Sequence, residues 1–261
     1  MNGPRYLQEL ATGWRYHFTL PEAAKALDAS PVAVRAVLRR LKGQGLLAMP
    51  VRGFYVVVPP EYRAMGCLPA DQFVPDLMDF LGAPYYAGLL TAAELHGAAH
   101  QRPQEFQVVT DHNRAPVSCG RVRVAFVARR DVRDVPTVGR NTLRGVLMVS
   151  TPDATALDLV TYAARAGGLD NVATVLAELA EALDPGALAD VASRLGDVAT
   201  VQRLGWLLDR VGADAKTRGL ADLVMRRAHR PVRLVRANPS AGAPLDTLWR
   251  VRVNAAVEVD T

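Results

Sequence analysis

Two helix-start signals close together near the N-terminus constrain the fold more than any other feature of the chain. Thr19-Leu20-Pro21-Glu22 is a capping box with a proline in the first turn, and it opens a short helix. Asp28-Ala29-Ser30 then forms a three-residue turn, and Ser30-Pro31 is a second N-cap followed by a first-turn proline. Two helices joined by so short a turn predict a helix-turn-helix.

The second helix of this pair is predicted to run from residue 31 to about 44 and to be amphipathic. Its buried stripe consists of apolar residues at i, i+3, i+4 and i+7, which are Val34, Val37, Leu38 and Leu41. A different face is basic and carries Arg35, Arg39 and Lys42 at the same spacing, with Arg40 beside them. Gly43 and Gly45 are expected to end the helix.

The segments on either side complete a small module. Residues 3–14 are predicted to form a first helix, and residues 46–58 form two strands joined by a tight turn near Arg52-Gly53. Pro59-Pro60 stops the second strand. The order helix, helix, turn, helix, β-hairpin predicts a winged helix-turn-helix.

The rest of the chain is predicted to mix helices and strands. The fold class is therefore α/β (α+β), a small winged helix-turn-helix followed by a larger mixed α/β domain. The predicted limits are 1–60 for the winged helix-turn-helix, 61–72 for a linker and 73–261 for the larger domain. Predicted helices in the larger domain cover residues 73–81, 87–99, 155–167, 170–183, 186–195, 198–212 and 217–228, and Ser150-Thr151-Pro152-Asp153 opens the third of them. Predicted strands cover residues 105–110, 121–128, 145–150, 231–237 and 247–257.

The positive charge of the chain is concentrated in the N-terminal module. The formal charge is +5, and residues 1–60 hold eight basic and three acidic residues, whereas residues 61–261 hold 23 of each. A basic terminal module indicates nucleic acid as its partner. The residues expected to contact double-stranded DNA are Ser30, Arg35, Arg39, Arg40, Lys42 and Arg52. The alternative is a solvated basic face on a winged helix that binds protein.

The charges of the larger domain are grouped in blocks. Residues 114–144 and 226–252 each carry +6, while residues 61–113 carry −5 and residues 145–200 carry −6. Arginines that alternate with apolar residues in two predicted strands should share one sheet face within each strand. The candidate second basic surface consists of Arg121, Arg123, Arg129, Arg130, Arg250 and Arg252. Two interpretations stay open: these arginines extend the surface offered to DNA or to an acidic partner, or they pair with the acidic block inside the fold.

Catalytic and metal-binding patterns are incomplete in this sequence. His96 and His100 are four residues apart, with Asp111-His112 nearby, but the glutamate of an HExxH site is missing. Pro75-Asp76 and Glu105-Phe106-Gln107 outline a metal-dependent nuclease, yet Gln107 stands where such an enzyme needs lysine. We expect no enzyme, no catalytic residue, no metal and no cofactor. A Mg²⁺-dependent nuclease is the alternative, and cleavage of DNA abolished by Asp76→Ala or Glu105→Ala would support it.

The number of cysteines and the hydropathy of the chain indicate in which cellular compartment it works. The chain has only two cysteines, Cys67 and Cys119, which excludes a disulfide scaffold and fits a reducing environment. No apolar run is long enough to span a bilayer, and no export or anchoring signal is visible at the start of the sequence. We therefore expect a cytoplasmic protein with no membrane partner.

Residues 85–103, YYAGLLTAAELHGAAHQRP, resemble a stretch of the AbiEi antitoxin family of type IV toxin–antitoxin (abortive infection) systems. The residues that carry the resemblance are Tyr85, Tyr86, Ala93, Leu95, His96, Gly97, Gln101 and Pro103. Residues 150–159, 203–212 and 247–254 are also similar to the family, so the resemblance spans nearly the whole chain. The same stretch has a purely structural interpretation, a core helix that includes Tyr85 and Tyr86 and is capped by Gly97.

The resemblance implies a transcriptional repressor with two activities. The N-terminal domain, with help from the C-terminal one, would bind inverted repeats in its own promoter. The C-terminal domain would counter a nucleotidyltransferase-like toxin, AbiEii, without forming a stable complex with it. The alternative is a winged-helix regulator without a toxin, whose C-terminal domain binds a ligand or a protein.

Overall fold

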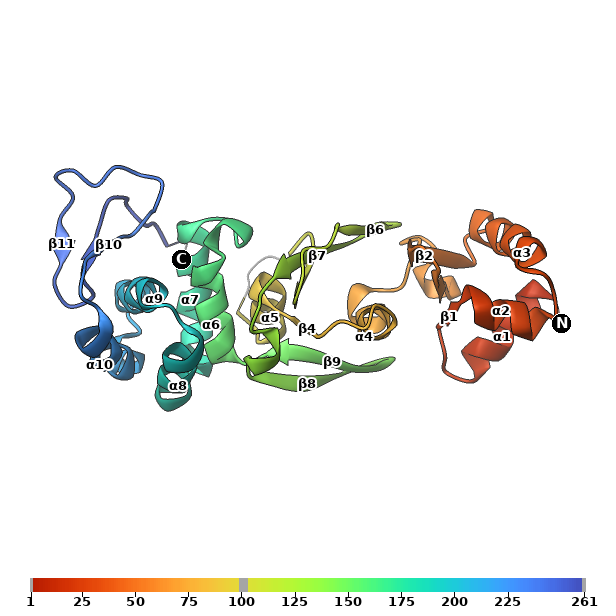
Figure 1. The fold of residues 1–261 in the computed structure, drawn as a ribbon, viewed down its shortest axis with the longest axis horizontal. Coiled ribbons are helices and arrows are strands. Elements are labelled where there is room, and N and C mark those ends of the chain that lie inside the picture. The colour runs from red at the N-terminus through yellow and green to blue at the C-terminus, as the bar shows by residue number, and fades with distance from the viewer. Residues whose placement is uncertain (1, 99–102, 260–261) are drawn as a thin grey trace. The chain divides into compact units, whose positions relative to one another are not determined.

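A computed structural model describes residues 2–98 and 103–259 and divides the chain into two compact units (Figure 1). Unit 1 comprises Met1–Tyr86, Gln104–Val132 and Gly139–Met148. Unit 2 comprises Ala87–Pro103, Arg133–Val138 and Val149–Thr261. Helices and strands occur in both units, so the mixed α/β class predicted from the sequence is confirmed.

Unit 1 begins with a small module of three helices and three strands, which we call the N-terminal module. Its elements are α1 (Gly3–Thr12), β1 (His17–Thr19), α2 (Leu20–Leu27), α3 (Pro31–Gly43), β2 (Leu47–Val51) and β3 (Phe54–Val57). The three strands form an antiparallel sheet in the order β1-β3-β2. The element order is the one that the sequence predicts, with β1 added.

Side-chain caps explain where the helices of this module begin. The Thr19 and Glu22 side chains form a capping box at α2, and the Ser30 side chain accepts the backbone N–H of Ala33 at α3. Asp28 ends α2 in the left-handed conformation, with φ 47°, which turns the chain into α3.

A compact apolar core holds the module together. Phe18 of β1 is fully buried and stacks on Tyr55 of β3, while the Tyr6 ring meets Phe18 edge-on. Val34, Leu38 and Leu41 of α3 face this core, as the sequence predicts. Burying one face of α3 leaves its opposite face to solvent.

The remainder of unit 1 contains α4 (Ala70–Phe80) and most of a six-stranded mixed sheet. The strands are β4 (Tyr85–Ala87), β5 (Phe106–Thr110), β6 (Val117–Cys119), β7 (Val122–Ala128), β8 (Thr137–Thr142) and β9 (Gly145–Ser150). Their order is β6-β7-β5-β4-β9-β8, with β5 parallel to β7 and β6 antiparallel to β7.

The structure corrects the helix predicted over residues 87–99, with Tyr85 and Tyr86 at its start. Tyr85–Ala87 is the strand β4, and the helix α5 covers only Leu89–Leu95. Gly88 is extended between the two, and Ala87 pairs with Val149 of β9. Burial of Tyr86 inside the sheet thus overrides the helical pattern.

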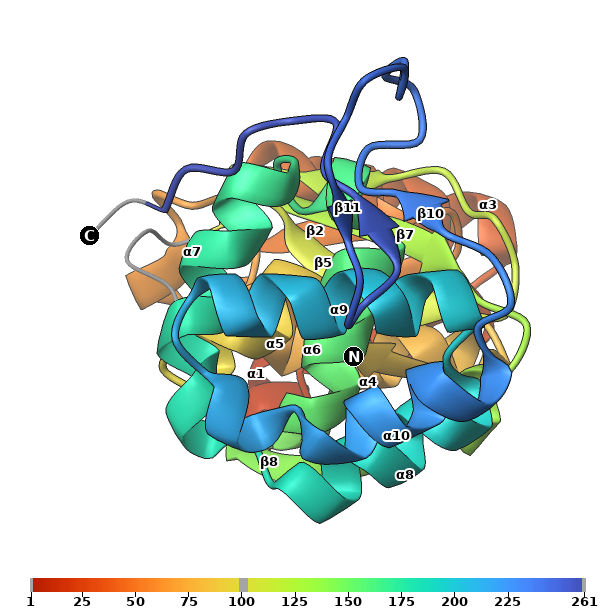
Figure 2. The ribbon, with the colours of Figure 1, turned by 90° about the vertical axis from the view of Figure 1, so that its left-hand side faces the viewer.

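Unit 2 is mainly helical and is built around α6 (Pro152–Thr161). The other helices are α5, α7 (Leu169–Leu179), α8 (Pro185–Leu195), α9 (Val198–Arg210) and α10 (Arg218–Arg227). All residues from Asp153 to Val160 are buried, so α6 is the central helix, and Figure 2 shows α9 crossing in front of it. Short 3₁₀ turns cover Pro60–Tyr62, Val132–Asp134, Ala163–Arg165, Ala180–Ala182 and Asp214–Lys216.

The last strands are shorter than the sequence predicts. In place of strands over 231–237 and 247–257, the structure has β10 (Val232–Arg233), β11 (Leu245–Asp246) and β12 (Val251–Arg252), in the order β10-β12-β11. Arg250 lies before β12 in the left-handed conformation, with φ 52°. The alternation argument that places Arg250 and Arg252 on one sheet face therefore does not hold. Within the described residues, no helix is both long enough and apolar enough to cross a bilayer.

Candidate nucleic-acid interface

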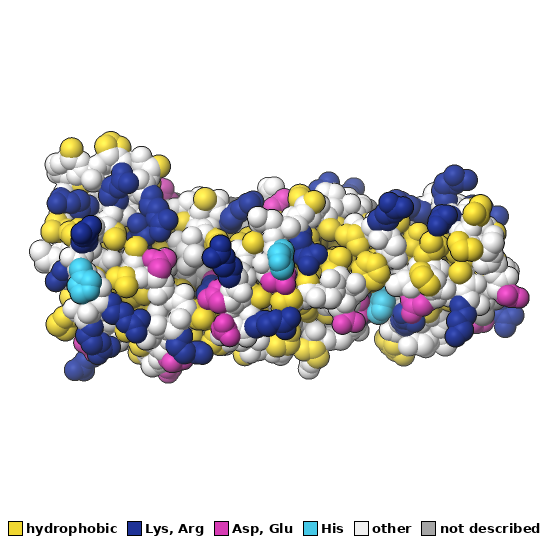
Figure 3. Space-filling view, in the orientation of Figure 1, with side chains coloured by type: hydrophobic (Ala, Val, Ile, Leu, Met, Phe, Trp, Pro, Cys, Tyr) yellow, Lys and Arg dark blue, Asp and Glu magenta, His cyan; other side chains and the backbone are white. Residues whose placement is uncertain are grey.

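The α3 helix presents a basic face to solvent, which we call the α3 basic face and define as Arg35, Arg39, Arg40 and Lys42. All four side chains are exposed, while Val34, Leu38 and Leu41 are buried on the opposite side. In Figure 3, Lys and Arg side chains gather over the part of unit 1 that contains α3 and β2. Amphipathicity alone therefore orients the basic residues outward.

The cations of this face are not neutralised by neighbouring acids. Among the residues that the structure describes, none of the four forms an ion pair, whereas Arg5, Arg15 and Arg194 each pair with a carboxylate. Ser30 is exposed at the start of α3 and keeps its hydroxyl proton while it accepts the Ala33 N–H at 3.3 Å. The N-terminus of α3 thus combines a hydroxyl donor with the positive end of the helix dipole.

Helical geometry separates the members of the face. At about 100° per residue, Val32, Ala36, Arg39 and Gly43 lie most directly opposite the buried stripe. Arg35 and Lys42 lie on one flank and Arg40 lies on the other. Arg40 and Lys42 are in the last turn, where a positive charge is stabilised by the negative end of the helix dipole. The centre of such a face meets base edges in a groove, and its flanks meet the phosphates on either side.

Arg52 occupies the tip of the β2–β3 hairpin and is exposed. The hairpin itself is anchored, because the Phe54 ring lies 5.4 Å from the Phe80 ring of α4. Gly53 is next to the same ring, with φ +89°, a conformation that favours glycine. Arg52 therefore projects from a hairpin fixed against α4 rather than from a free wing.

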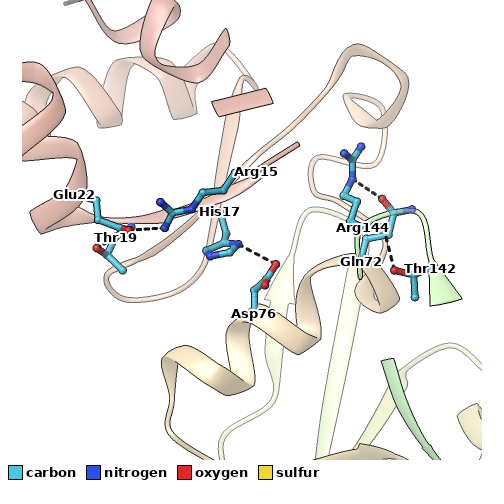
Figure 4. A network of polar contacts seen from close by, with 8 residues as sticks. All are labelled: Arg15, His17, Thr19, Glu22, Gln72, Asp76, Thr142 and Arg144. Carbon is cyan, nitrogen blue, oxygen red and sulfur yellow. Dashed lines mark hydrogen bonds and ion pairs between the residues drawn. The ribbon is translucent and has the colours of Figure 1, made fainter. Parts of the chain in front are cut away.

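Two contacts fix the N-terminal module on the rest of unit 1. Figure 4 shows the first, between His17 and Asp76, and also the hydrogen bond of Arg144 to Gln72. His17 of β1 contacts Asp76 of α4, with 2.9 Å between Nδ1 and Oδ2, and its ring stacks on Phe54. This contact engages one of the two acids that the nuclease alternative requires.

The second contact is made by Arg144, in the turn between β8 and β9. Its guanidinium lies 3.4 Å from the centre of the Tyr16 ring, its Nε donates to Gln72 Oε1 at 2.7 Å, and only 9% of its side chain is exposed. Arg144 belongs to a basic block of the sequence, but in the structure it is a packing residue. Its partners are distant along the chain, so the sequence contains no signal for them.

The candidate second basic surface is distributed over both units. Arg121, Arg123 and Arg130 are exposed in unit 1, and Arg250 and Arg252 are exposed in unit 2. Arg129 has a side chain only 6% exposed and pairs with Asp131 through two N–H···O contacts of 2.8 and 3.0 Å. Arg129 therefore contributes no free charge to a surface.

The capping box of α2 is stabilised by the negative charge of the Glu22 carboxylate. Burial raises the pKa of the Glu22 carboxyl, but hydrogen bonds from Arg15 and Thr19 outweigh this and hold the pKa below its usual range. The carboxylate is therefore charged and fully engaged at neutral pH, so it does not compete for the cations of α3.

The histidine pattern near residue 96 has a structural explanation. His96 Nε2 lies 2.7 Å from the carbonyl oxygen of Ser150, and Gly97 continues the chain with φ +84°. His100 lies outside the described residues. Among those described, no group of three His, Cys, Asp or Glu residues is arranged to hold a metal ion.

Residues 203–212, most of which belong to α9, pack against the C-terminal segment that contains Trp249. Gly205 faces Trp249 so closely that a Cβ atom would lie 2.0 Å from the indole ring. The indole N–H donates to Asp209 Oδ2 at 2.6 Å. Buried Arg203 donates through Nε to the carbonyl oxygens of Arg233 and Leu234, and burial lowers the pKa of its guanidinium. This part of the family resemblance thus reflects packing.

Comparison with known proteins found a matching family model and a similar solved structure. The family model of the AbiEi antitoxin C-terminal domain matches residues 86–210. A solved structure, "Crystal structure of RV2827C protein from Mycobacterium tuberculosis", is similar with a TM-score of 0.68 and 19% identity, over 95% of this chain and 89% of that one. Among curated proteins, none matches. The likeness in structure shows the fold, and over residues 86–210 the chain is similar to the AbiEi antitoxin C-terminal domain.

Proposed function

We propose that this protein is a DNA-binding antitoxin of a type IV toxin–antitoxin system, which represses its own promoter and counters a nucleotidyltransferase-like toxin. The AbiEi domain supports the antitoxin role. The observation that carries the DNA-binding part is the α3 basic face, exposed and without ion pairs among the described residues, on the second helix of a helix-turn-helix with a β-hairpin behind it. We interpret residues 1–60 as a winged helix-turn-helix on this basis.

The roles of individual residues follow from their places on α3. Arg39 lies near the centre of the face, and Arg35 lies on a flank one turn closer to the N-terminus of α3. Both would donate to base edges, guanine O6 and N7 being the favoured acceptors. Ser30, Arg40 and Lys42 lie at the end and the flanks and would contact phosphates. Arg52, anchored through its hairpin, would reach the backbone beside them.

Binding to the DNA upstream of the gene tests this proposal. Replacing Arg35 and Arg39 together by alanine should weaken binding at least tenfold, because one good bidentate contact accounts for about 1–3 kcal/mol. The matched control is Arg210→Ala/Arg218→Ala, which removes the same charge from exposed positions in unit 2. Equal affinities of the two double variants would exclude α3 as the recognition helix.

Co-expression tests the antitoxin activity separately. The full chain should restore growth to cells that express a nucleotidyltransferase-like toxin encoded beside it. The Arg35→Ala/Arg39→Ala variant should still do so when expressed from an unrelated promoter, because the AbiEi domain lies at residues 86–210. Loss of rescue in this variant would mean that the two activities are not separate.

A second candidate function is that of a ligand-responsive regulator without a toxin. An open groove of about 460 Å³, a volume typical of small-molecule sites, is lined mainly by apolar residues that include Leu7, Ala11, Leu46, Val57 and Val58. It lies on the N-terminal module, not on the C-terminal domain where the sequence suggested a ligand. Absence of a toxin gene beside this one, together with a failed co-expression rescue, would favour this function.

A further inference from the structure

Val32 is an apolar side chain in the first turn of α3, and 72% of it is exposed. It stands apart from the buried stripe of the same helix. Helical geometry puts it in line with Ala36 and Arg39, directly opposite the core, with Arg35 on the adjacent flank. The apolar periodicity of the helix begins at Val34 and does not include it.

The stability of α3 does not account for valine at this position. A β-branched residue is a poorer helix former than alanine, and an exposed isopropyl group gains nothing from burial in the folded protein. At an exposed helical position with no other role, alanine would be favoured over valine. Alanine is indeed found one turn further on, at Ala36. Val32 gains apolar contact only when something covers the α3 basic face.

The neighbours of Val32 indicate what covers it. The guanidinium groups of Arg39 on the same line and of Arg35 beside it require an anionic or acceptor-rich partner. The first turn of a recognition helix is the part that meets base edges. In the major groove the one exposed apolar group of a base pair is the C5-methyl of thymine. Small side chains at Ala36 and Gly43 allow the helix backbone to approach the groove floor.

We propose that Val32 is a specificity-determining residue that recognises the C5-methyl group of a thymine in the major groove. This inference rests on the proposed DNA binding by α3 and adds to it the identity of one base. The rise along the helix from Val32 to Arg35 is about 4.5 Å, and from Arg35 to Arg39 about 6 Å. Base steps are about 3.4 Å apart, so the thymine should lie within two base steps of the guanine read by Arg35.

Replacement of thymine by uracil, which lacks only the methyl group, tests the proposal. The full chain is used to select duplexes from a random-sequence library, and each thymine of the selected site is then replaced by uracil in turn. At one thymine per recognition helix, uracil should weaken binding of the wild type about fourfold, the factor that corresponds to ~0.8 kcal/mol for one buried methyl-sized group. Val32→Ala makes a smaller apolar contact and should therefore show a clearly smaller difference between the two duplexes. This variant folds because alanine favours the helix.

The control variant is Leu143→Ala, which removes an equally exposed apolar side chain, 73% exposed, from the β8–β9 turn. It should keep the full sensitivity to uracil. If selected duplexes bind but wild type and Val32→Ala respond alike to uracil at every thymine, the proposal is overturned while DNA binding by α3 stands. If no duplex is selected above background, both the proposal and the DNA-binding function are overturned.

Discussion

The guanidinium of Arg144 stacks on the ring of Tyr16, 3.4 Å from its centre, and this contact fastens the β8–β9 turn to the N-terminal module. The same side chain donates to Gln72 of α4, which in turn donates to the Tyr62 hydroxyl at 3.1 Å. One buried cation thus links three segments of unit 1. The arrangement fixes the position of the N-terminal module on the rest of unit 1.

Arg144→Ala should lower the free energy of unfolding by about 2–3 kcal/mol, the sum of a desolvated cation–π contact and a charged hydrogen bond. Arg144→Lys should lose most of the same amount, because an ammonium group lacks the planar stacking surface of guanidinium. Arg140→Ala, an exposed change in β8, serves as control and should stay within about 0.5 kcal/mol of wild type. Urea unfolding measures all three, and equal stability of Arg144→Ala and Arg140→Ala would refute the role of the contact.

Gly205→Ala should destabilise unit 2 strongly, by about 3 kcal/mol, because the added Cβ would lie 2.0 Å from the Trp249 ring. The damage should depend on that ring. In a double-mutant cycle with Trp249→Leu, the alanine should therefore cost much less than it does in the wild-type background. Additive effects of the two changes would show that the close approach is not the cause.

The sequence predicted the elements whose signals are local. The caps at Thr19 and Ser30, the buried stripe of α3 and the long helices of unit 2 all follow from short-range patterns, and the structure has them at nearly the expected bounds. The strands β1, β4, β6 and β8 were missed because they are short or lack alternation, and pairing with distant strands defines them. The partners of Arg144 and Asp76 were missed for the same reason: both contacts join segments far apart in the sequence.

The salt dependence of DNA binding should separate phosphate contacts from base contacts. Arg40→Gln and Lys42→Gln should each reduce the slope of log K against log salt by about 0.9, and should weaken binding equally on all sequences. Arg35→Gln should instead relax discrimination at one base pair. Titrations at several salt concentrations on a selected site and on a shuffled one measure both effects. Unchanged slopes for Arg40→Gln and Lys42→Gln would remove these two residues from the interface.

The Glu22 carboxyl should contribute stability that disappears in acid. Its pKa in the folded protein is lower than the ordinary value of 4.5, so the folded state favours the charged form. Its contribution is complete above pH 4.5 and is lost as the pH falls from there through the folded pKa. The stability advantage of wild type over Glu22→Gln should therefore shrink in that window, and it should be modest because the side chain is partly solvated. Glu181→Gln, at an exposed position, is the control.

Asp153 should show the opposite sign. Burial raises the pKa of its carboxyl above the ordinary 3.8, and this outweighs the N–H of Asp184 that its Oδ1 accepts at 3.0 Å. The charged form is therefore disfavoured in the folded protein, and wild type should gain stability relative to Asp153→Asn as the pH falls through the folded pKa toward 3.8. Asp153→Ala should be worse than Asp153→Asn at all pH values, by about 1–3 kcal/mol, because it leaves the Asp184 N–H without its acceptor. Unfolding of the three proteins between pH 7 and pH 3.8 measures this, and parallel pH profiles for wild type and Asp153→Asn would contradict it.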